Sequence, residues 1–293
     1  MLSGSLVAII TPMHEDGSIH FEKMGELIEY HIDNQTDGIV LLGTTGEAST
    51  MTFEEEKQLV SFAAEKIAKR VPLIVGSGSN NTVTAVENSK AFAEHGADML
   101  LVVTPYYNRA NEGGMVRHFE AIANSVDIPI ILYNVPGRTG CSLSVSAVAT
   151  LAKHPNIIGI KEASGDISYA VKLAPLLNDD FAMYSGNDDI IVPLLSLGAK
   201  GVISVWANIM PKEVHDLVSL YLEGRHQESL AIQTAYLDLV DALFYETNPI
   251  PVKHAMNELG FGVGPLRMPL GEMDAPNYQK LVAVLAKYKE VWS

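Results

Sequence analysis

The sequence predicts an α/β protein, a (β/α)8 TIM barrel with a C-terminal helical extension. Eight short apolar segments begin near residues 5, 38, 72, 98, 129, 156, 181 and 200, and amphipathic helical segments fill the gaps. Their starts lie some 19 to 34 residues apart, which is the spacing that a strand followed by a helix requires. An open, doubly wound sheet is the alternative fold. No GxGxxG turn follows the first strand, which weakens that alternative.

Composition fits a compact globule of this size. Of 293 residues, 47% are hydrophobic and 19% are charged, which argues against disorder. No segment has the length and apolar character of a membrane span, and the first residues lack the basic region of a signal peptide. We therefore expect a cytoplasmic protein.

Charge and cysteine content exclude several classes of function. A net charge of −15 opposes binding to nucleic acid and to anionic membranes, because both need clustered Lys and Arg. Cys141 is the only cysteine, so an intrachain disulfide and a cysteine-based metal site are impossible. There is no HExxH, EF-hand or Walker pattern, and we expect neither a metal nor a nucleotide cofactor.

Helix signals separate the strands in order. Thr52 with Glu55 forms a capping box at the start of one helix, and residues 85–95, 115–125 and 145–153 have similar helical patterns. After Val205 only helical patterns follow, interrupted by Gly and Pro. The predicted organisation is a barrel over residues 1–205 and a helical region over residues 206–293 that packs on the barrel.

The sixth predicted strand carries a lysine where it ends. Because strand side chains alternate, an inward Lys161 would share its face with Ile157 and Gly159, while Ile158 and Ile160 would face the helices. Gly159 would then leave room beside the lysine stem. A buried amine loses hydration, which lowers its pKa and makes it a nucleophile toward ketones. The alternative, a lysine that reaches from the strand end into solvent, fits this segment equally well.

Other strand ends carry groups suited to binding acids, and in a parallel barrel these ends form the active site. The second strand, 38–42, ends in Gly43-Thr44-Thr45-Gly46-Glu47, whose hydroxyls and amides suit a carboxylate. The fourth ends in Tyr106 and Tyr107, of which at least one is expected to serve packing or a subunit contact. The fifth, 130–132, supplies Tyr133 and then Arg138, a guanidinium suited to bidentate carboxylate binding. After the seventh, Asn187 or Asp188 can also serve simply as a helix cap.

Three of these segments together resemble the signature segments of the dihydrodipicolinate synthase family: 43–47, Tyr133-Asn134-Val135-Pro136-Gly137-Arg138-Thr139-Gly140, and Ile160-Lys161-Glu162-Ala163-Ser164-Gly165. The resemblance runs along nearly the whole chain and includes Ser185-Gly186-Asn187-Asp188-Asp189 and Asn248-Pro249-Ile250-Pro251-Val252-Lys253. The first and third segments are shared with other pyruvate-dependent class I aldolases and lyases. The arginine segment is the more specific one.

The resemblance implies a mechanism and a role for each site residue. Lys161 would form an imine with pyruvate, and the derived enamine would attack L-aspartate 4-semialdehyde, in lysine (diaminopimelate) biosynthesis, with no external cofactor. Tyr133 would be the general acid and base, linked through Thr44 to Tyr107 of a neighbouring subunit in a homotetramer. Four further residues would form the substrate pocket. Thr45 would bind the pyruvate carboxylate and Arg138 the semialdehyde carboxylate. The backbones of Gly186 and Ile203 would line the same pocket.

Two alternative functions remain, and at one regulatory site the chain departs from the family pattern. Another aldolase of the wider family, such as N-acetylneuraminate lyase or a keto-deoxy-sugar-acid aldolase, would share Lys161 and Tyr133 but generally lacks the arginine. A barrel that has lost catalysis is the alternative from another class, which the full residue set disfavours.

Many relatives are inhibited by lysine. Tyr106 and Asn80 match that regulatory site, whereas its glutamate falls at Thr84 and its histidines fall at Phe53 and Glu56, so we expect lysine insensitivity.

Overall fold

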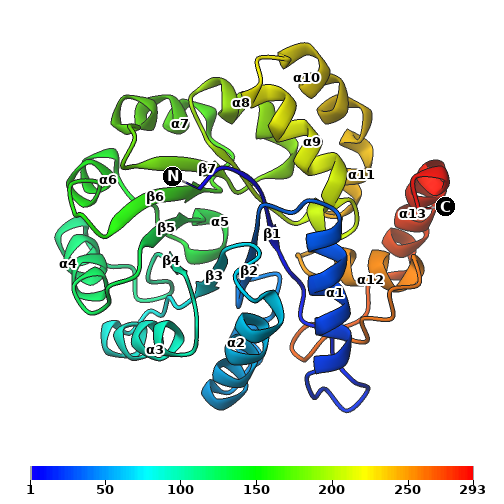
Figure 1. The fold of residues 1–293 in the computed structure, drawn as a ribbon, viewed down its shortest axis with the longest axis horizontal. Helices are drawn as coiled ribbons and strands as arrows, with labels where there is room; N and C mark the ends of the chain where they lie inside the picture. Colours follow the sequence, from blue (N-terminus) through cyan, green and yellow to red (C-terminus); the bar gives the residue numbers. More distant parts are fainter. Residues whose placement is uncertain (1, 293) are drawn as a thin grey trace.

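Eight parallel strands close into a barrel in the computed structural model, which describes residues 2–292 (Figure 1). Each strand pairs with the next, and β8 pairs with β1. The strands are β1 Gly4–Ala8, β2 Gly38–Leu41, β3 Leu73–Gly76, β4 Met99–Val103, β5 Ile130–Asn134, β6 Ile157–Glu162, β7 Ala182–Ser185 and β8 Gly201–Ser204. Every strand begins within one residue of its predicted start, and the predicted barrel is confirmed.

Helices surround the barrel and extend it at one side (Figure 1). They are α1 Phe21–Asp33, α2 Phe53–Ile67, α3 Thr82–Glu94, α4 Glu112–Ala123, α5 Pro136–Thr139, α6 Val145–Leu151, α7 Ile167–Leu173, α8 Ile191–Ser196, α9 Pro211–Leu222, α10 His226–Ala235, α11 Leu237–Ala242, α12 Ile250–Glu258 and α13 Ala275–Leu285. The predicted capping box of α2 is present: the Thr52 amide donates to the Glu55 carboxylate, and the Glu55 amide donates to the Thr52 hydroxyl. Helix α3 begins three residues earlier than predicted, because Asn81 caps it.

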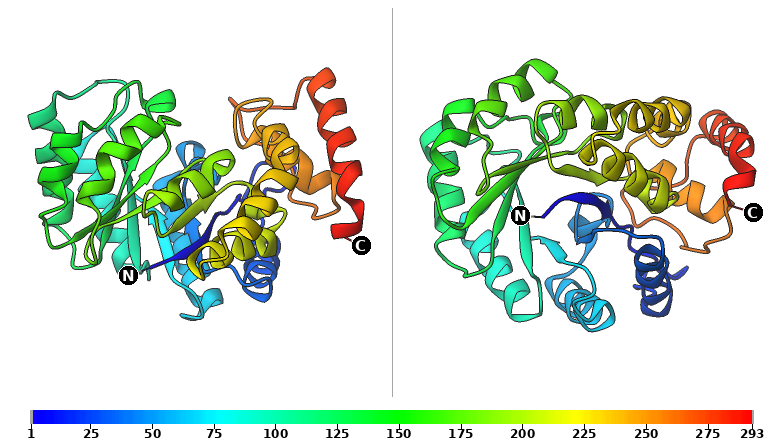
Figure 2. Two further views of the ribbon diagram at one scale, coloured as in Figure 1. Left: turned by 90° about the horizontal axis from the view of Figure 1, so that it is seen from above. Right: turned by 45° about the horizontal axis from the view of Figure 1, so that its top comes forward.

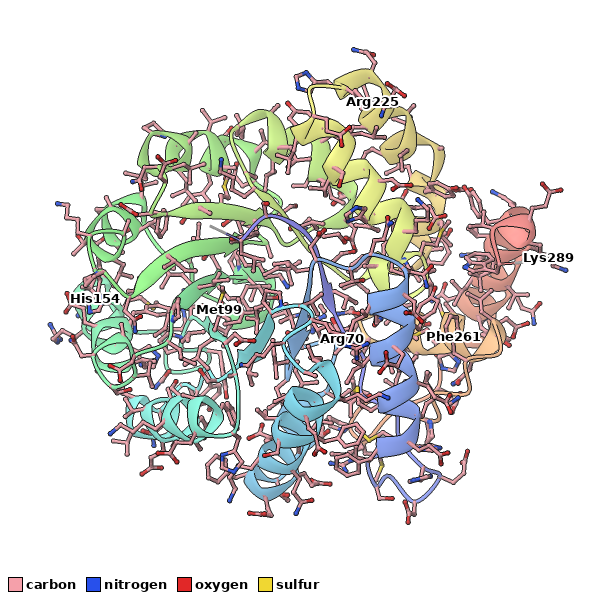
Figure 3. The ribbon with its side chains drawn as sticks, viewed as in Figure 1. Arg70, Met99, His154, Arg225, Phe261 and Lys289 are labelled. Atoms are coloured by element: carbon pink, nitrogen blue, oxygen red, sulfur yellow. The ribbon has the colours of Figure 1, made fainter. Side chains whose placement is uncertain are left out.

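Two apolar cores hold the barrel together. The larger lies between the strands and the helices, and the smaller fills the barrel interior, where inward side chains of the strands meet. Met99, near the centre of the ring in Figure 3, packs against the inner core, whereas Arg225 and Lys289 extend outward at the rim. A fully buried aliphatic side chain contributes about 1.5–3 kcal/mol. The packed interior leaves space for chemistry only where the strands end.

The C-terminal part is in contact with the barrel along several elements. Helix α9 packs against β1 and β8, which is the position of an eighth barrel helix. Helices α12 and α13 stand together at one side of the molecule in every view (Figure 2). The division at residues 205 and 206 stays a prediction. Within residues 2–292, no helix combines the length and apolar character that crossing a membrane requires.

Candidate active site

Lys161 points into the mouth of the barrel. It is opposite Tyr133 in the β5–β6 register and opposite Tyr184 in the β6–β7 register, so these side chains share the inner face. Only 6% of Lys161 is exposed, and its Nζ lies 4.4 Å from the centroid of the Tyr133 ring. This contact with an aromatic face holds the amine inside. The alternative of a lysine reaching into solvent is therefore excluded for this structure.

The alternation predicted for the sixth strand is wrong at its beginning. A register shift lies between Ile130 and Ile131 of β5, where β6 contributes one extra residue. Ile157 consequently joins the outer core, and Ile158 packs against the inner one, the reverse of the prediction. Beyond the shift, Gly159 pairs with the inward Ile131 and Ile160 belongs to the outer core, as predicted.

Space beside the lysine stem comes from Gly186 rather than from Gly159. A Cβ atom at residue 159 would meet the carbonyl oxygen of Ala182 at 2.6 Å, so that glycine permits close approach of β7. A Cβ atom at residue 186 would lie 3.0 Å from Cε of Lys161 and 2.5 Å from Cβ of Ala163. Gly186 thus keeps the side chain of Lys161 in its position.

If Lys161 forms the imine with pyruvate that the family resemblance implies, Gly186→Ala should slow that step by roughly 10-fold or more, because small misplacements of a reacting group are costly. The measurement is the rate at which borohydride traps pyruvate on the protein. Gly271→Ala is the matched control, since a Cβ atom there meets nothing within 4 Å. An unchanged trapping rate in the Gly186 variant would show that the glycine does not set the position of the lysine.

The loop after β2 is anchored by residues from the far end of the chain. Glu47, in the left-handed region with φ 58°, accepts from Nζ of Lys253 at 2.6 Å and from the amide of Arg267 at 2.9 Å. Lys253 is 1% exposed, and burial lowers its pKa while the charge of Glu47 opposes that shift. The anchored loop carries Thr44 and Thr45, so the C-terminal region fixes the backbone from which the two hydroxyls extend.

Arg138 lies on α5, a short helix that Pro136 begins directly after β5. Its backbone amide donates to the carbonyl of Val135, and its Nη2 donates to the backbone carbonyl of Asn248 at 2.8 Å. The Asn248 side chain donates from Nδ2 to Oγ1 of Thr45 at 3.0 Å. Arg138 and Thr45 are therefore held by the same residue of the segment between α11 and α12.

A cavity of about 390 Å³ opens beside these residues. Its lining combines groups from the ends of the strands with groups from α2 and α3. The lining residues are Leu42, Gly43, Thr44, Ala48, Ser49, Met51, Glu56, Gly76, Gly78, Ser79, Thr84, Asn88, Leu101, Val103, Tyr106, Tyr133, Val135, Arg138 and Thr139. Three predicted site residues, Thr44, Tyr133 and Arg138, thus share one cavity.

The other predicted site residues lie beside the cavity or outside it. Lys161 is in contact with the ring of Tyr133, and Gly186 is against Lys161. Ile203 is buried in the same inner core as Tyr133, and Thr45 is buried within the loop after β2. Tyr107 is apart from them: it is 89% exposed, and its hydroxyl makes no hydrogen bond to any other residue in the range 2–292.

Polar residues behind the lysine escaped prediction as site components. Asp188 is buried and accepts from the amides of Val205 and Trp206 at 2.9 and 2.8 Å. Burial raises the pKa of Asp188, and hydrogen bonds and the charge of Lys161 oppose that shift. Glu162 accepts from Nδ2 of Asn134 at 2.8 Å, and burial raises its pKa too. The sequence signal for Asp188 was its place after β7, which a helix cap explained equally well.

A buried lysine at the mouth of a (β/α)8 barrel, in contact with a phenol whose cavity a guanidinium also lines, is the arrangement of a lyase of the Schiff-base aldolase class. Comparison with known proteins identifies the group within that class. The model of the Dihydrodipicolinate synthetase family matches residues 1–288, and the chain belongs to this family. The family resemblance predicted from the sequence is thereby confirmed.

Individual relatives agree with this membership. A 4-hydroxy-tetrahydrodipicolinate synthase from Thermoanaerobacter sp. (strain X514) is 52% identical over 98% of this chain and 97% of its own length. The chloride-inhibited dihydrodipicolinate synthase from Acinetobacter baumannii, complexed with pyruvate, has a TM-score of 0.96 at 42% identity and covers 99% of each chain. The enzyme from Cyanidioschyzon merolae with lysine bound has a TM-score of 0.94 at 37% identity and covers 97% of each chain. They confirm the predicted enzyme class, a lyase of lysine biosynthesis that joins pyruvate to L-aspartate 4-semialdehyde.

Proposed function

We propose that the barrel mouth of this chain condenses pyruvate with L-aspartate 4-semialdehyde through a covalent imine on Lys161, without a cofactor. The observation that carries the assignment is the buried amine of Lys161, 4.4 Å from the Tyr133 ring centroid at the ends of β5 and β6. The amine attacks the keto carbon of pyruvate, and the carbonyl oxygen leaves as water after it takes up protons. Loss of a methyl proton then gives the enamine.

Carbon–carbon bond formation and ring closure complete the reaction. The enamine carbon attacks the aldehyde carbon of the semialdehyde, whose oxygen takes a proton and becomes the hydroxyl of the product. The amino group of the semialdehyde portion next attacks the imine carbon, displaces Lys161 and closes the ring to 4-hydroxy-tetrahydrodipicolinate. Tyr133 is the general acid and base in this assignment, because its ring is in contact with the amine from the neighbouring strand β5.

The proton path is assigned to Tyr133, Thr44 and the Tyr107 of a neighbouring subunit in a homotetramer. Thr44 and Tyr133 line one cavity, which supports their pairing. The exposure of Tyr107, whose φ of 67° holds it in the left-handed region, supports a role toward another subunit rather than within one. Such an assembly would operate in the cytoplasm, with no nucleic acid or membrane as partner.

Borohydride trapping tests the assignment. Incubation with pyruvate and borohydride should add a stable mass to Lys161, and a barrel without catalysis should gain none. Addition of L-aspartate 4-semialdehyde, N-acetylneuraminate or keto-deoxy-gluconate to separate samples then distinguishes the reaction from those of the sugar-acid aldolases. Turnover with either sugar acid and none with the semialdehyde would contradict the proposed substrate.

Arg138→Ala should raise the KM for the semialdehyde by roughly 10- to 100-fold, the loss of one charge-assisted contact. Pyruvate trapping should stay near the wild-type level, since the guanidinium is assigned to the second carboxylate only. The variant keeps the Asn248 carbonyl in place but removes its donor. Equal losses for both substrates would assign Arg138 to the architecture of the site instead.

Lysine is expected not to inhibit this enzyme at physiological concentrations, although one relative is known with lysine bound. Thr84, Tyr106 and Glu56 line the cavity, so the only carboxylate in that lining belongs to Glu56. Burial, with the charge of Glu55, raises the pKa of Glu56 to about 7. At neutral pH much of Glu56 is therefore uncharged and pairs poorly with an ammonium group.

The pH dependence provides the check on this assignment. Because the pKa of Glu56 lies above that of an ordinary glutamate, its charge appears as the pH rises through 7, so any residual inhibition should strengthen between pH 6 and pH 8. The measurement is initial rate against lysine concentration at both pH values. Clear inhibition by submillimolar lysine that Tyr106→Ala removes would contradict the expected insensitivity.

A further inference from the structure

Asn248 connects the two residues assigned to the two substrates. It lies just before α12, outside the strands, and only 6% of it is exposed. Its side-chain Nδ2 donates to Oγ1 of Thr45 at 3.0 Å, and its backbone carbonyl accepts from Nη2 of Arg138 at 2.8 Å. The first contact uses the side chain of Asn248, and the second uses its backbone. A side-chain change at residue 248 therefore affects Thr45 and preserves the acceptor for Arg138.

The direction of the Asn248–Thr45 hydrogen bond determines what Thr45 can do. A hydroxyl carries one proton, and when it accepts a hydrogen bond from an amide N–H, its own proton is available for a different acceptor. The Thr45 hydroxyl proton has no acceptor among residues 2–292, and Thr45 itself is buried. A buried donor without an acceptor suits an anionic ligand, because a carboxylate has only acceptor oxygens.

The side-chain amide of Asn248 makes no other hydrogen bond in the described part of the chain. Its Oδ1 is buried and has no hydrogen-bond partner among residues 2–292, while its Nδ2 contacts Thr45. The side chain of Asn248 thus contacts the rest of residues 2–292 through Nδ2, at the point where two assigned substrate contacts meet.

We propose that Asn248 is a positioning residue that orients the Thr45 hydroxyl as a hydrogen-bond donor to the carboxylate of pyruvate. The inference rests on the proposed role of Thr45. It assigns part of the pyruvate site to the segment between α11 and α12, 203 residues away along the chain. The side chain of Asn248 should therefore affect pyruvate binding selectively, while its backbone supports Arg138.

The decisive variant is Asn248→Asp, which has nearly the same shape but reverses the hydrogen bond. An aspartate oxygen accepts the Thr45 proton, which removes the donor from pyruvate, and its charge repels the carboxylate. The KM for pyruvate should rise by roughly 10- to 100-fold, and by a smaller factor in Asn248→Ala, where the hydroxyl is free but no longer oriented. The KM for the semialdehyde should change less than threefold in both, because the backbone carbonyl is unchanged.

Two further variants separate this inference from the roles on which it rests. Thr45→Val should raise the KM for pyruvate, and adding Asn248→Ala to it should have no further effect if Asn248 acts through Thr45. Gln227→Glu places the same charge on α10 at an exposed position and serves as the control. Borohydride trapping of pyruvate in the wild-type protein reports independently on imine formation.

The outcomes divide cleanly. A selective rise in the pyruvate KM that is larger for aspartate than for alanine, together with no further effect of Asn248→Ala in the Thr45→Val background, supports the inference. An unchanged pyruvate KM in Asn248→Asp, equal rises for both substrates, or a full additive effect in the double variant overturns it. An unchanged KM in Thr45→Val overturns it as well, through the role of Thr45. Absence of trapping in the wild-type protein would instead overturn the proposed reaction.

Discussion

Lys161→Ala is expected to lower kcat by roughly 10⁴-fold or more, because no other group at the barrel mouth can form the covalent intermediate. Borohydride should then leave the mass of the protein unchanged after incubation with pyruvate. The fold should survive, because within residues 2–292 the amine has no ion pair and its contact is with the Tyr133 ring. Residual turnover is measured by coupled assay and stability by the midpoint of urea denaturation.

Lys161→Arg is the stricter variant, since it keeps a cation against the ring but cannot form the imine. It should be as inactive as the alanine variant. Wild-type turnover in either variant, or trapping of pyruvate on Lys253, the other buried lysine, would contradict the assignment of Lys161.

Lys253→Met should have the largest effect on stability and lower it by about 3–5 kcal/mol, the usual cost of leaving one member of a buried ion pair without its partner. Glu47 would remain buried at 2% exposure and would keep only the amide of Arg267 as a donor. Because Glu47 ends the loop that carries Thr44 and Thr45, activity should fall with stability. The measurements are the urea midpoint and the Tm.

Neutralising the Glu47 carboxylate tests whether its unpaired charge causes the loss of stability. Glu47→Gln combined with Lys253→Met should recover most of the lost stability, since an uncharged amide still accepts from Arg267 and no charge stays buried. Lys212→Met is the matched control, because Lys212 pairs with Asp216 on the surface, where such pairs contribute about 0–1 kcal/mol. A double variant less stable than the single one would show that packing, and not charge, is at stake.

Much of the fold followed from local pattern. Each strand is short, apolar and followed by a helical pattern, and that order alone required a parallel sheet, because a parallel pair needs a crossover between its strands. The ends of the strands then gathered Thr44, Tyr133, Arg138 and Lys161 at one mouth, which strand geometry predicts once the barrel is assumed. Their individual roles remain predictions from the family resemblance.

Local pattern failed where a neighbouring chain segment decided the geometry. The alternation of β6 breaks at Ile157 and Ile158, because the pairing with β5 shifts by one residue there. The glycine beside the lysine stem is Gly186, which follows β7, and not Gly159, which lies on β6 with the lysine. Neither feature has a signal within the segment itself.

The sequence by itself determined the barrel, the strand starts and the place of Lys161 at the end of a strand, because these depend on side-chain type and on periodicity along the chain. Only the tertiary structure decided how the site is supported. Lys253 meets Glu47 across 206 residues, Asn248 meets Thr45 across 203, and Arg138 reaches Asn248 across 110. A buried charge or amide destabilises the fold unless its partner is in place. Partners so far apart in the chain are brought together by packing in three dimensions, so a local sequence pattern does not predict them.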